Sequence, residues 1–366
     1  MTTDCIVFGV LMPDASEDWP GRNRLLEDLA LRHAVVFLER GSSRRSILSP
    51  VTIGRSGSHP EVRVAHHAIA LSDNRWTRRL GPLASSIDRW RLRRALAREG
   101  LTRPLLWLTV PEPRLYRAIP HAEALFDCMD PCFEPARQEQ FDRDEAWVVR
   151  RSRLVFASAW SLQRRMARIH DDVVLLPNAA DAVDVARFVQ PPSVGHRPRV
   201  GYLGTLDRRI DGELLVALAE ALPEVDLVLG GRVNDPDAEY VQRLKAMPHV
   251  TLTGQIGTEE GRDLVAGLDV GIIPFTPGEM NDAVNPVKLF MYLAYGKPVV
   301  ATDLEECRRN EYVETARDTE EFVALVRSAL EADPDAAARH AFAAANTWSV
   351  RAGQAEDALR TRGLIP

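Results

Sequence analysis

Lys288 stands where the residue types and their spacing most clearly suggest chemistry. It lies in the run NPVKLFMYLAYGKPVVATD, which spans residues 285–303. Asn285 is a favourable N-cap and Pro286 suits the first helical position, so we expect a helix to begin here. The Lys288 ammonium would then join the free N–H groups and the positive end of the helix dipole in attracting an anion. The alternative is an ordinary surface helix.

The use of lysine along the chain favours the anion site. Of the 46 lysine and arginine residues only three are lysines, Lys245, Lys288 and Lys297, and two of them lie in this one segment. A lysine ammonium is a compact point charge that suits a phosphate group. We therefore predict that Asn285, Pro286 and Lys288 form a corner that holds a phosphate.

A glycine turn supplies a second group of candidate anion-binding residues. The run RVGYLGTLDRRIDGELL reads as a strand, a turn at Gly204 and Thr205, and then a helix. Backbone N–H groups at such a turn can face a phosphate, and Arg209 could add a bidentate contact. Arg208 is the other candidate for that contact, and either arginine could instead be a solvated turn residue.

Gly231 is a further candidate for the same site. It follows Gly230 at the end of the apolar run VDLVLGG. A residue without a side chain lets the backbone pass close to a ligand. The two glycines could equally serve only to shape a turn.

Two carboxylates in the first half of the chain are candidates for acid–base chemistry. Asp130 closes the apolar run ALFDCMD and precedes Pro131, so it should emerge at the carboxyl end of a strand. There it could deprotonate an acceptor hydroxyl as a general base. Asp127 is the second choice. For either residue the alternative is a structural carboxylate that caps a turn or loop.

Length and composition limit the class of protein. The 366 residues suit two domains, and 45% hydrophobic with 27% charged residues is typical of a soluble globular protein. A net charge of −6 gives no reason to expect nucleic-acid binding. The four cysteines are irregularly spaced, which favours free thiols in a reducing compartment. No long apolar run or leader segment is evident, so we expect a cytoplasmic protein.

The order of strands and helices predicts two α/β halves. Near-continuous apolar runs alternate with amphipathic segments, which is typical of parallel sheets covered on both faces. The proline-rich stretch VQPPSVGHRPR is the best linker candidate. We predict a first domain over 1–183, a linker over 184–198 and a second domain over 199–349. Each would be a Rossmann-like, doubly wound sheet, and the two would face each other across a cleft.

The motifs taken in order resemble those of GT-B glycosyltransferases, especially family 4 and the teichuronic-acid-type bacterial transferases. The run from Arg199 resembles the opening of their donor domain, and LPNAADAVDVARF resembles their Pro-Asn-Gly-Val-Asp junction. The segment 285–303 is similar to their Pro-x-Lys helix and Gly-Lys-Pro-Val-Val strand. NTWSVRAG resembles the tryptophan segment before the last helix, which implies that 350–366 crosses back to the first domain. DCMDP and WPGRNRLLEDLA fit the acceptor half less tightly.

This resemblance implies transfer of a sugar from a nucleoside diphosphate donor to a hydroxyl acceptor in a polysaccharide, glycolipid or secondary metabolite. No cofactor beyond the donor substrate is implied. The departing diphosphate would need preorganised positive groups. These would come from Gly204, Thr205, Arg209, Gly231, Asn285, Pro286 and Lys288.

One part of the pattern departs from the family. Family 4 enzymes usually carry two glutamates eight positions apart, the second of which grips the ribose hydroxyls. Ala283 and Met291 occupy these positions here. A ribose contact would have to come from elsewhere, with Glu279 and Asp282 as candidates.

Residues 75–103 form a basic stretch with nine arginines, one aspartate and one glutamate. Trp76 and Trp90 lie within it. A basic amphipathic surface with aromatics suits docking on anionic lipid at the inner membrane face, where a lipid-linked acceptor would be presented. The alternatives are an acidic acceptor or a solvated arginine-rich helix.

A metal site is not expected. The Asp-x-Asp triplets lie in helical, turn or tail contexts rather than after a buried strand, and His66, His67 and His121 have no metal-ligand spacing. We therefore predict a metal-independent enzyme.

Two other functions remain open from the sequence. One is a non-catalytic GT-B partner subunit, which Ala283 and Met291 favour. The other is a nucleotide-sugar epimerase of the same fold. The sugar, the nucleobase, the acceptor, the stereochemical course and the oligomeric state are not fixed by the sequence.

Overall fold

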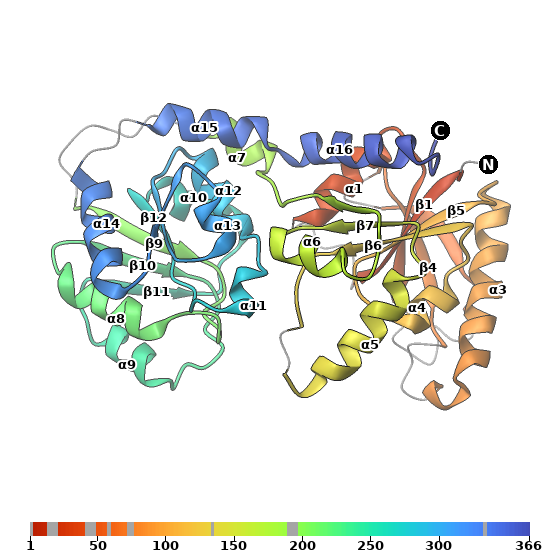
Figure 1. The fold of residues 1–366 in the computed structure, drawn as a ribbon, viewed down its shortest axis with the longest axis horizontal. Helices are drawn as coiled ribbons and strands as arrows, with labels where there is room; N and C mark the ends of the chain where they lie inside the picture. The colour runs from red at the N-terminus through yellow and green to blue at the C-terminus, as the bar shows by residue number, and fades with distance from the viewer. Residues whose placement is uncertain are drawn as a thin grey trace. The chain divides into compact units, whose positions relative to one another are not determined.

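The structure is a computed structural model that describes residues 3–12, 21–40, 49–56, 60–71, 77–132, 135–188, 197–331 and 335–366. Most of the predicted linker, together with Arg75 and Trp76 of the basic stretch, lies outside the described residues. The chain divides into two compact units (Figure 1). Unit 1 comprises Met1–Pro177 and Ser349–Pro366, and unit 2 comprises Asn178–Trp348.

Unit 1 is built on an eight-stranded sheet with the strand order β3-β4-β2-β1-β5-β6-β7-β8. Only β3 and β4 pair antiparallel among the described strands. The strands are β1 (Cys5–Met12), β2 (Val35–Arg40), β3 (Thr52–Arg55), β4 (Arg63–Ile69), β5 (Pro104–Leu108), β6 (Glu123–Cys128), β7 (Leu154–Ala157) and β8 (Val173–Leu175).

The helices of unit 1 connect these strands. The α-helices are α1 (Arg22–Ala30), α3 (Pro82–Arg98), α4 (Pro113–Ala118), α5 (Gln138–Val149), α6 (Trp160–Met166) and α16 (Trp348–Thr361), and the 3-10 turns are η1 (Arg78–Leu80) and η2 (Pro135–Arg137). Strands β5 and β7 are buried along their whole length, as expected for a parallel sheet covered on both faces.

Unit 2 has a six-stranded parallel sheet with the order β11-β10-β9-β12-β13-β14. Numbered within the unit, this is the doubly wound order 3-2-1-4-5-6. The strands are β9 (Arg199–Leu203), β10 (Asp226–Gly230), β11 (Val250–Gly254), β12 (Val270–Ile273), β13 (Val299–Thr302) and β14 (Val313–Ala316).

The helices of unit 2 lie on both faces of its sheet (Figure 1). Helix α8 packs against α9 and α14, whereas α12 packs against α7 and α15. Their bounds are α7 (Ala182–Ala186), α8 (Gly212–Ala221), α9 (Glu239–Lys245), α10 (Thr258–Ala266), α11 (Glu279–Asp282), α12 (Val287–Ala294), α13 (Glu305–Arg308), α14 (Thr319–Glu331) and α15 (Ala336–Ala345). The predicted α/β, doubly wound architecture is confirmed for each unit.

The end of the chain is fastened to unit 1. Within it, Arg362 forms a bidentate ion pair with Asp172, at 2.6 and 2.5 Å. Glu356 on α16 accepts hydrogen bonds from Arg32 and His33. The C-terminal segment therefore belongs to the same compact unit as the first 177 residues.

The structure corrects some predicted boundaries and elements. The division between the units falls after Pro177 rather than at 183, and the predicted linker begins inside helix α7. Strands β3, β4 and β14 did not emerge from the sequence pattern. Strand β4 is interrupted by His66 and His67, and β14 is a short, partly exposed edge strand, so neither gives a clean apolar run.

Candidate functional site

The switch point of unit 2 lies between β9 and β12, where the strand order reverses. The loops that follow these two strands are joined by backbone hydrogen bonds. Asp211 N donates to Pro274 O at 2.8 Å, and Thr276 N donates to Arg209 O at 2.8 Å. Since ligands of doubly wound sheets bind at the carboxyl ends of strands beside the switch point, this is where a site is expected.

Glycine is required in the loop after β9 because two backbones approach closely there. Gly204 has a φ of 153° and Gly231 a φ of 132°. Gly204 N donates to Gly230 O at 2.8 Å. A Cβ added at Gly231 would lie 2.2 Å from Gly204 O. Gly231 is thus explained by its contact with the Gly204 turn, and a role toward a ligand stays a prediction.

Helix α12 begins one residue later than predicted. Pro286, rather than Asn285, occupies the N-cap position, and the helix begins at Val287. The Asn285 side chain is engaged elsewhere: its Oδ1 accepts from Asn178 N at 3.0 Å and its Nδ2 donates to Glu306 at 2.8 Å. Asn285 therefore ties the chain at Asn178 to the start of α12. The prediction of Asn285 as N-cap was wrong.

The Lys288 ammonium is enclosed by aromatic side chains. Its Nζ donates to Tyr202 Oη at 3.1 Å and lies 4.5 Å from the Tyr202 ring centroid and 4.6 Å from that of Phe275. A Cβ added at Gly204 would lie 3.1 Å from the same nitrogen, so the ammonium reaches the glycine turn. Burial, together with the positive charge of Arg209, lowers the pKa of Lys288 to about 7.

Arg209 lies in the same corner and is held by Asp207. Its Nε and Nη2 donate to the Asp207 carboxylate at 3.0 and 2.8 Å, and its guanidinium carbon lies 5.6 Å from the Phe275 ring centroid. Burial tends to raise the pKa of Asp207, but the hydrogen bonds from Arg209 hold it below its ordinary value. Arg208 is exposed. The corner thus contains the cations Lys288 and Arg209 with one carboxylate between them.

The structure brings together Gly204, Thr205, Arg209 and Lys288 of the predicted donor site. Thr205 O accepts a hydrogen bond from Tyr202 Oη at 3.2 Å. Tyr202 and Phe275 are the residues that sequence reasoning missed. Both are buried aromatics next to apolar strands, a pattern that indicates core packing rather than a ligand site.

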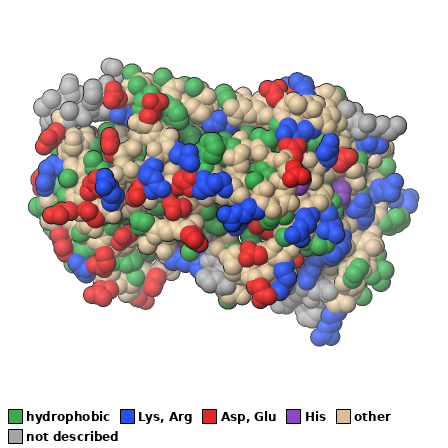
Figure 2. Space-filling view, in the orientation of Figure 1, with side chains coloured by type: hydrophobic (Ala, Val, Ile, Leu, Met, Phe, Trp, Pro, Cys, Tyr) green, Lys and Arg blue, Asp and Glu red, His purple; other side chains and the backbone are tan. Residues whose placement is uncertain are grey.

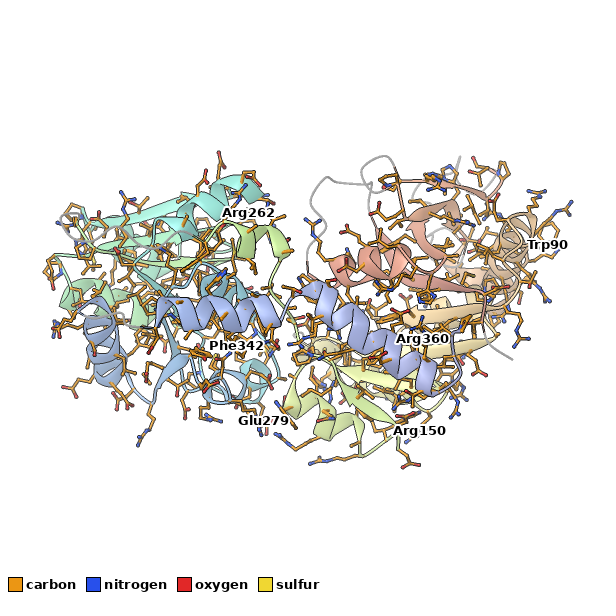
Figure 3. The ribbon with its side chains drawn as sticks, turned by 90° about the horizontal axis from the view of Figure 1, so that it is seen from above. Trp90, Arg150, Arg262, Glu279, Phe342 and Arg360 are labelled. Atoms are coloured by element: carbon orange, nitrogen blue, oxygen red, sulfur yellow. The ribbon has the colours of Figure 1, made fainter. Side chains whose placement is uncertain are left out.

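The positions considered for the ribose contact differ in their surroundings. Ala283 is buried and Met291 is partly exposed on α12. Asp282 accepts a hydrogen bond from Glu305 N at 2.9 Å, which commits one of its oxygens to the start of α13. Glu279 is exposed at the start of α11 (Figure 3). Of the two candidates, Glu279 has the more accessible carboxylate.

The two candidate carboxylates at the carboxyl end of β6 in unit 1 have opposite environments. Asp127 has no exposed surface and is bound by Arg22 through two hydrogen bonds of 2.8 and 2.5 Å. It also accepts from Trp107 Nε1 at 3.0 Å. Asp130 follows the last residue of β6 by two positions and is exposed. This geometry gives Asp127 a structural role and leaves Asp130 as the candidate general base.

The described part of the basic stretch forms η1 and α3. Leu83, Ile87 and Trp90 are 60%, 37% and 62% exposed and follow one another at helical spacing on α3. Figure 3 shows Trp90 projecting outward from its helix. The Arg94 guanidinium carbon lies 5.8 Å from the Trp90 ring centroid. Helix α3 therefore presents apolar and cationic side chains together.

The described residues show neither a metal-binding cluster nor a helix that could span a membrane. No three histidine, cysteine, aspartate or glutamate side chains within the described ranges gather as ligands for a metal ion. No helix in that part of the chain is both long and apolar enough to span a bilayer. None of the four cysteines forms a disulfide, and Cys5, Cys128 and Cys307 are buried.

Comparison with known proteins identifies the domain in unit 2. Residues 197–332 match the family described as glycosyl transferases group 1. A curated relative, the putative teichuronic acid biosynthesis glycosyltransferase TuaH of Bacillus subtilis, is 33% identical over 106 residues, which cover 29% of this chain. The match spans 26%, about a quarter, of the length of that relative.

Solved structures share the fold over nearly the whole chain. Sucrose-phosphate synthase of Thermosynechococcus elongatus superposes with a TM-score of 0.70 at 18% identity, covering 98% of each chain. HepE of Anabaena, in complex with UDP-glucose, superposes with a TM-score of 0.66 at 17% identity, covering 97% of this chain and 99% of that one. Unit 2 thus matches the glycosyl transferases group 1 family over residues 197–332, and the chain as a whole shares the GT-B fold of these solved structures.

Proposed function

We propose that this protein transfers a sugar from a nucleoside diphosphate donor to an acceptor hydroxyl. The observation that carries the proposal is the cationic corner of unit 2, where the Lys288 ammonium and the Arg209 guanidinium meet beside the Gly204 turn. A diphosphate leaving group gains negative charge as the glycosidic bond breaks, and fixed positive groups stabilise that charge.

The donor in this proposal is a UDP-sugar, and the transferred group is a hexosyl residue. The structures of HepE contain UDP or UDP-glucose, and that of a trehalose-6-phosphate protein of E. coli contains UDP-2-fluoro glucose. Lys288, Arg209 and the backbone N–H groups of Gly204 and Thr205 would bind the diphosphate. With two side-chain cations in this corner, the transfer is proposed to need no metal ion. Glu279 is the candidate contact for the ribose.

The acceptor is proposed to bind unit 1 near Asp130, which would take the proton from the attacking hydroxyl. Bacterial polysaccharides, glycolipids and secondary metabolites all offer such hydroxyls, and the Bacillus subtilis relative is named for teichuronic acid biosynthesis, which favours an acceptor of that kind. A lipid-linked acceptor would be reached if the protein docks on the inner face of the cytoplasmic membrane. The exposed Leu83, Ile87 and Trp90 on the arginine-rich α3 support that docking.

The test is nucleotide binding measured by calorimetry with UDP, GDP and dTDP, their sugars, and uridine. UDP should bind the wild-type chain, and Lys288→Ala should weaken UDP binding by roughly tenfold to a hundredfold while changing uridine binding little. Lys245→Ala is the matched control, because Lys245 is an exposed lysine on α9. Equal losses for UDP and uridine in Lys288→Ala would remove the phosphate assignment.

The same titrations separate the rival functions. Failure of every nucleotide to bind would indicate a non-catalytic partner subunit. Binding followed by interconversion of the donor sugar, without transfer, would indicate an epimerase. Transfer that persists in the presence of a chelator would support the proposed independence from metal ions, and its loss would contradict it.

A further inference from the structure

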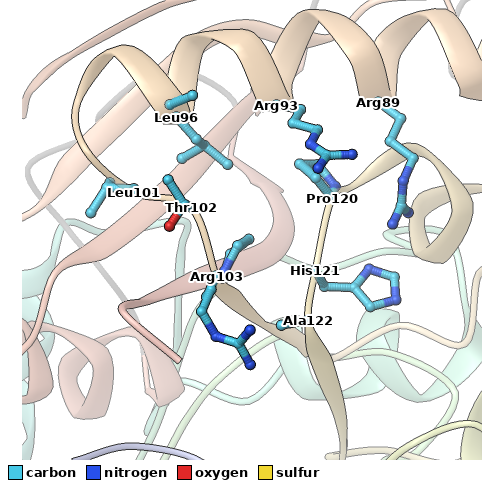
Figure 4. Close-up of a pocket in the computed structure, with 11 residues that line it drawn as sticks. Arg89, Arg93, Leu96, Leu101, Thr102, Arg103, Pro120, His121 and Ala122 are labelled. Carbon is cyan, nitrogen blue, oxygen red and sulfur yellow. The ribbon is translucent and has the colours of Figure 1, made fainter. Parts of the chain in front are cut away.

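A pocket of about 390 Å³ lies in unit 1, away from the predicted acceptor site (Figure 4). Helix α3, the segment that leads into β5, and residues 120–122 before β6 form its walls. It therefore lies at the amino ends of β5 and β6. Asp130 follows the carboxyl end of β6, a strand that spans about 20 Å. The pocket is thus separate from any acceptor site near Asp130.

The pocket is strongly cationic. Arg89, Arg93 and Arg103 line it, and no carboxylate is among the described residues that do so. Figure 4 shows Arg89 and Arg93 extending from α3 toward Pro120 and His121. Two carboxylates lie close to the lining residues: Asp4 accepts hydrogen bonds from the backbone N–H groups of Thr102 and Arg103, and Glu123 directly follows Ala122 in the chain. Asp4 thus faces the peptide backbone there.

Two of the lining side chains are held in place by the surrounding chain. Arg89 Nη1 donates to Ile119 O at 2.9 Å and to Arg117 O at 3.2 Å. Its Nε and Nη2 groups have no hydrogen-bond partner among the described residues. His121 Nδ1 donates to Ile119 O at 2.8 Å, and its ring packs edge-on against Tyr116. The hydrogen bonds of Nη1 therefore fix the orientation of the Arg89 guanidinium, and its Nε and Nη2 groups stay available to a ligand.

The positive groups also affect one another. Burial and the neighbouring charge of Arg93 lower the pKa of Arg89. Burial, with a smaller effect of the Arg89 charge, lowers the pKa of His121. Like charges gathered in a partly buried place lower the stability of the empty site, and an anion bound there would relieve that repulsion.

We propose that this pocket is a binding site for a phosphate group, distinct from the donor site. Guanidinium groups bind phosphate oxygens through paired, charge-assisted hydrogen bonds. The volume accommodates a phosphate with an attached small moiety, and Leu96, Leu101 and Pro120 supply an apolar wall for that moiety. The phosphate belongs either to a soluble phosphate ester or to the headgroup of a lipid. This proposal does not depend on the glycosyltransferase activity.

Charge reversal at one arginine tests the proposal. Arg93→Glu removes a cation from the pocket without disturbing the Arg89 contacts, since Arg93 is exposed and has no partner among the described residues. Arg98→Glu is the matched control, because it makes the same change on the exposed last turn of α3 outside the pocket. Circular dichroism should show both variants folded. Neither substitution touches Lys288, so UDP binding in both should equal that of the wild type.

Two probes distinguish the sources of the phosphate. Binding of glycerol phosphate is measured by calorimetry. Binding to lipid is measured by co-sedimentation of the protein with vesicles of phosphatidylcholine alone or of phosphatidylcholine mixed with phosphatidylglycerol. At least one phosphate probe should bind the wild type, with Arg93→Glu about tenfold weaker and Arg98→Glu within about twofold. Binding of glycerol phosphate indicates a soluble ester, and binding of anionic vesicles alone indicates a headgroup. The proposal would be overturned if Arg93→Glu and Arg98→Glu weakened phosphate binding equally, or if the wild type bound neither probe.

Discussion

The two units differ in how they use charge near the carboxyl ends of their strands. In unit 1 the charges are paired: Asp127 is bound by Arg22, and Glu145 accepts a hydrogen bond from Arg165 at 2.7 Å. In the corner of unit 2 beside Gly204, two cations, Lys288 and Arg209, face one described carboxylate, Asp207, which is bound by Arg209. A paired, buried charge stabilises the fold once its partner is present, whereas an excess of one sign is compensated only by a ligand. The comparison therefore separates structural charges from those available to a substrate.

The largest expected difference is between Asp127 in β6 and Asp130 just after that strand. Asp127→Asn would leave the Arg22 guanidinium buried without its counter-charge, so we expect a loss of about 3 kcal/mol in the free energy of unfolding. Asp130→Asn should change that free energy by less than about 0.5 kcal/mol, because Asp130 is exposed. It should lower the transfer rate about a hundredfold or more if Asp130 is the base.

Urea unfolding and a transfer assay on the two variants check this pair of expectations. Wild-type protein and Asp142→Asn, an exposed carboxylate on α5, serve as controls. A stable Asp127→Asn protein would show that the buried pair is dispensable for folding. A fully active Asp130→Asn protein would remove the base assignment.

This pair also shows what sequence can and cannot reveal. Asp127 and Asp130 lie three positions apart in one apolar run, and nothing in that run shows that Asp127 has a buried partner. The distinction comes from Arg22, which is far away in sequence and reaches Asp127 only because β1, β5 and β6 adjoin in the sheet. Sequence reasoning preferred Asp130 because it closes the run and precedes Pro131, but it could not foresee that Arg22 binds Asp127.

The cationic corner of unit 2 was more predictable. A glycine turn after one strand and a helix start after another meet at a switch point in any doubly wound sheet, so Gly204 and Lys288 could be placed together. The aromatic rings around Lys288 could not be predicted, because Tyr202 and Phe275 look like core residues. The role of Asn285 depends on Asn178 and was equally hidden.

The close approach of the glycine loops gives a second, smaller expected effect. Gly231→Ala would place a Cβ 2.2 Å from Gly204 O at a φ of 132°. The Gly204 turn must shift to relieve this contact, so we expect a loss of about 2–3 kcal/mol in the free energy of unfolding and weaker UDP binding.

Gly254→Ala is the control for this substitution. Gly254 also has a positive φ, of 69°, but a Cβ there would have no atom within 4 Å. Only the backbone strain of about 1 kcal/mol should remain, with UDP affinity unchanged. Thermal and chemical unfolding, followed by calorimetry with UDP, distinguish the two cases. If both variants lose UDP affinity equally, the close approach of Gly231 to Gly204 is not what shapes the site.

The smallest effect concerns the protonation of Lys288. Its pKa of about 7 in the free protein should rise when a diphosphate binds, because the anion favours the ammonium form. Binding is then strongest below pH 7 and weakens as the pH rises through 7 toward the pKa of the complex. The loss should be at most about tenfold per pH unit. The guanidiniums of the unit 1 pocket stay charged in this range, so phosphate binding there should lack this dependence.

Calorimetry with UDP-glucose between pH 7 and pH 9 tests this expectation, because a diphosphate esterified at both ends has no ionisation of its own in that range. Near pH 8 the complex should take up close to one proton, read from the dependence of the binding heat on the buffer. Lys288→Arg, which keeps its charge, should bind with a nearly constant affinity over the same interval. A wild-type affinity that does not change with pH would mean that Lys288 is already fully charged in the free protein. The aromatic enclosure would then hold a permanent cation, and the corner of unit 2 would resemble the arginine pocket of unit 1 in its electrostatics.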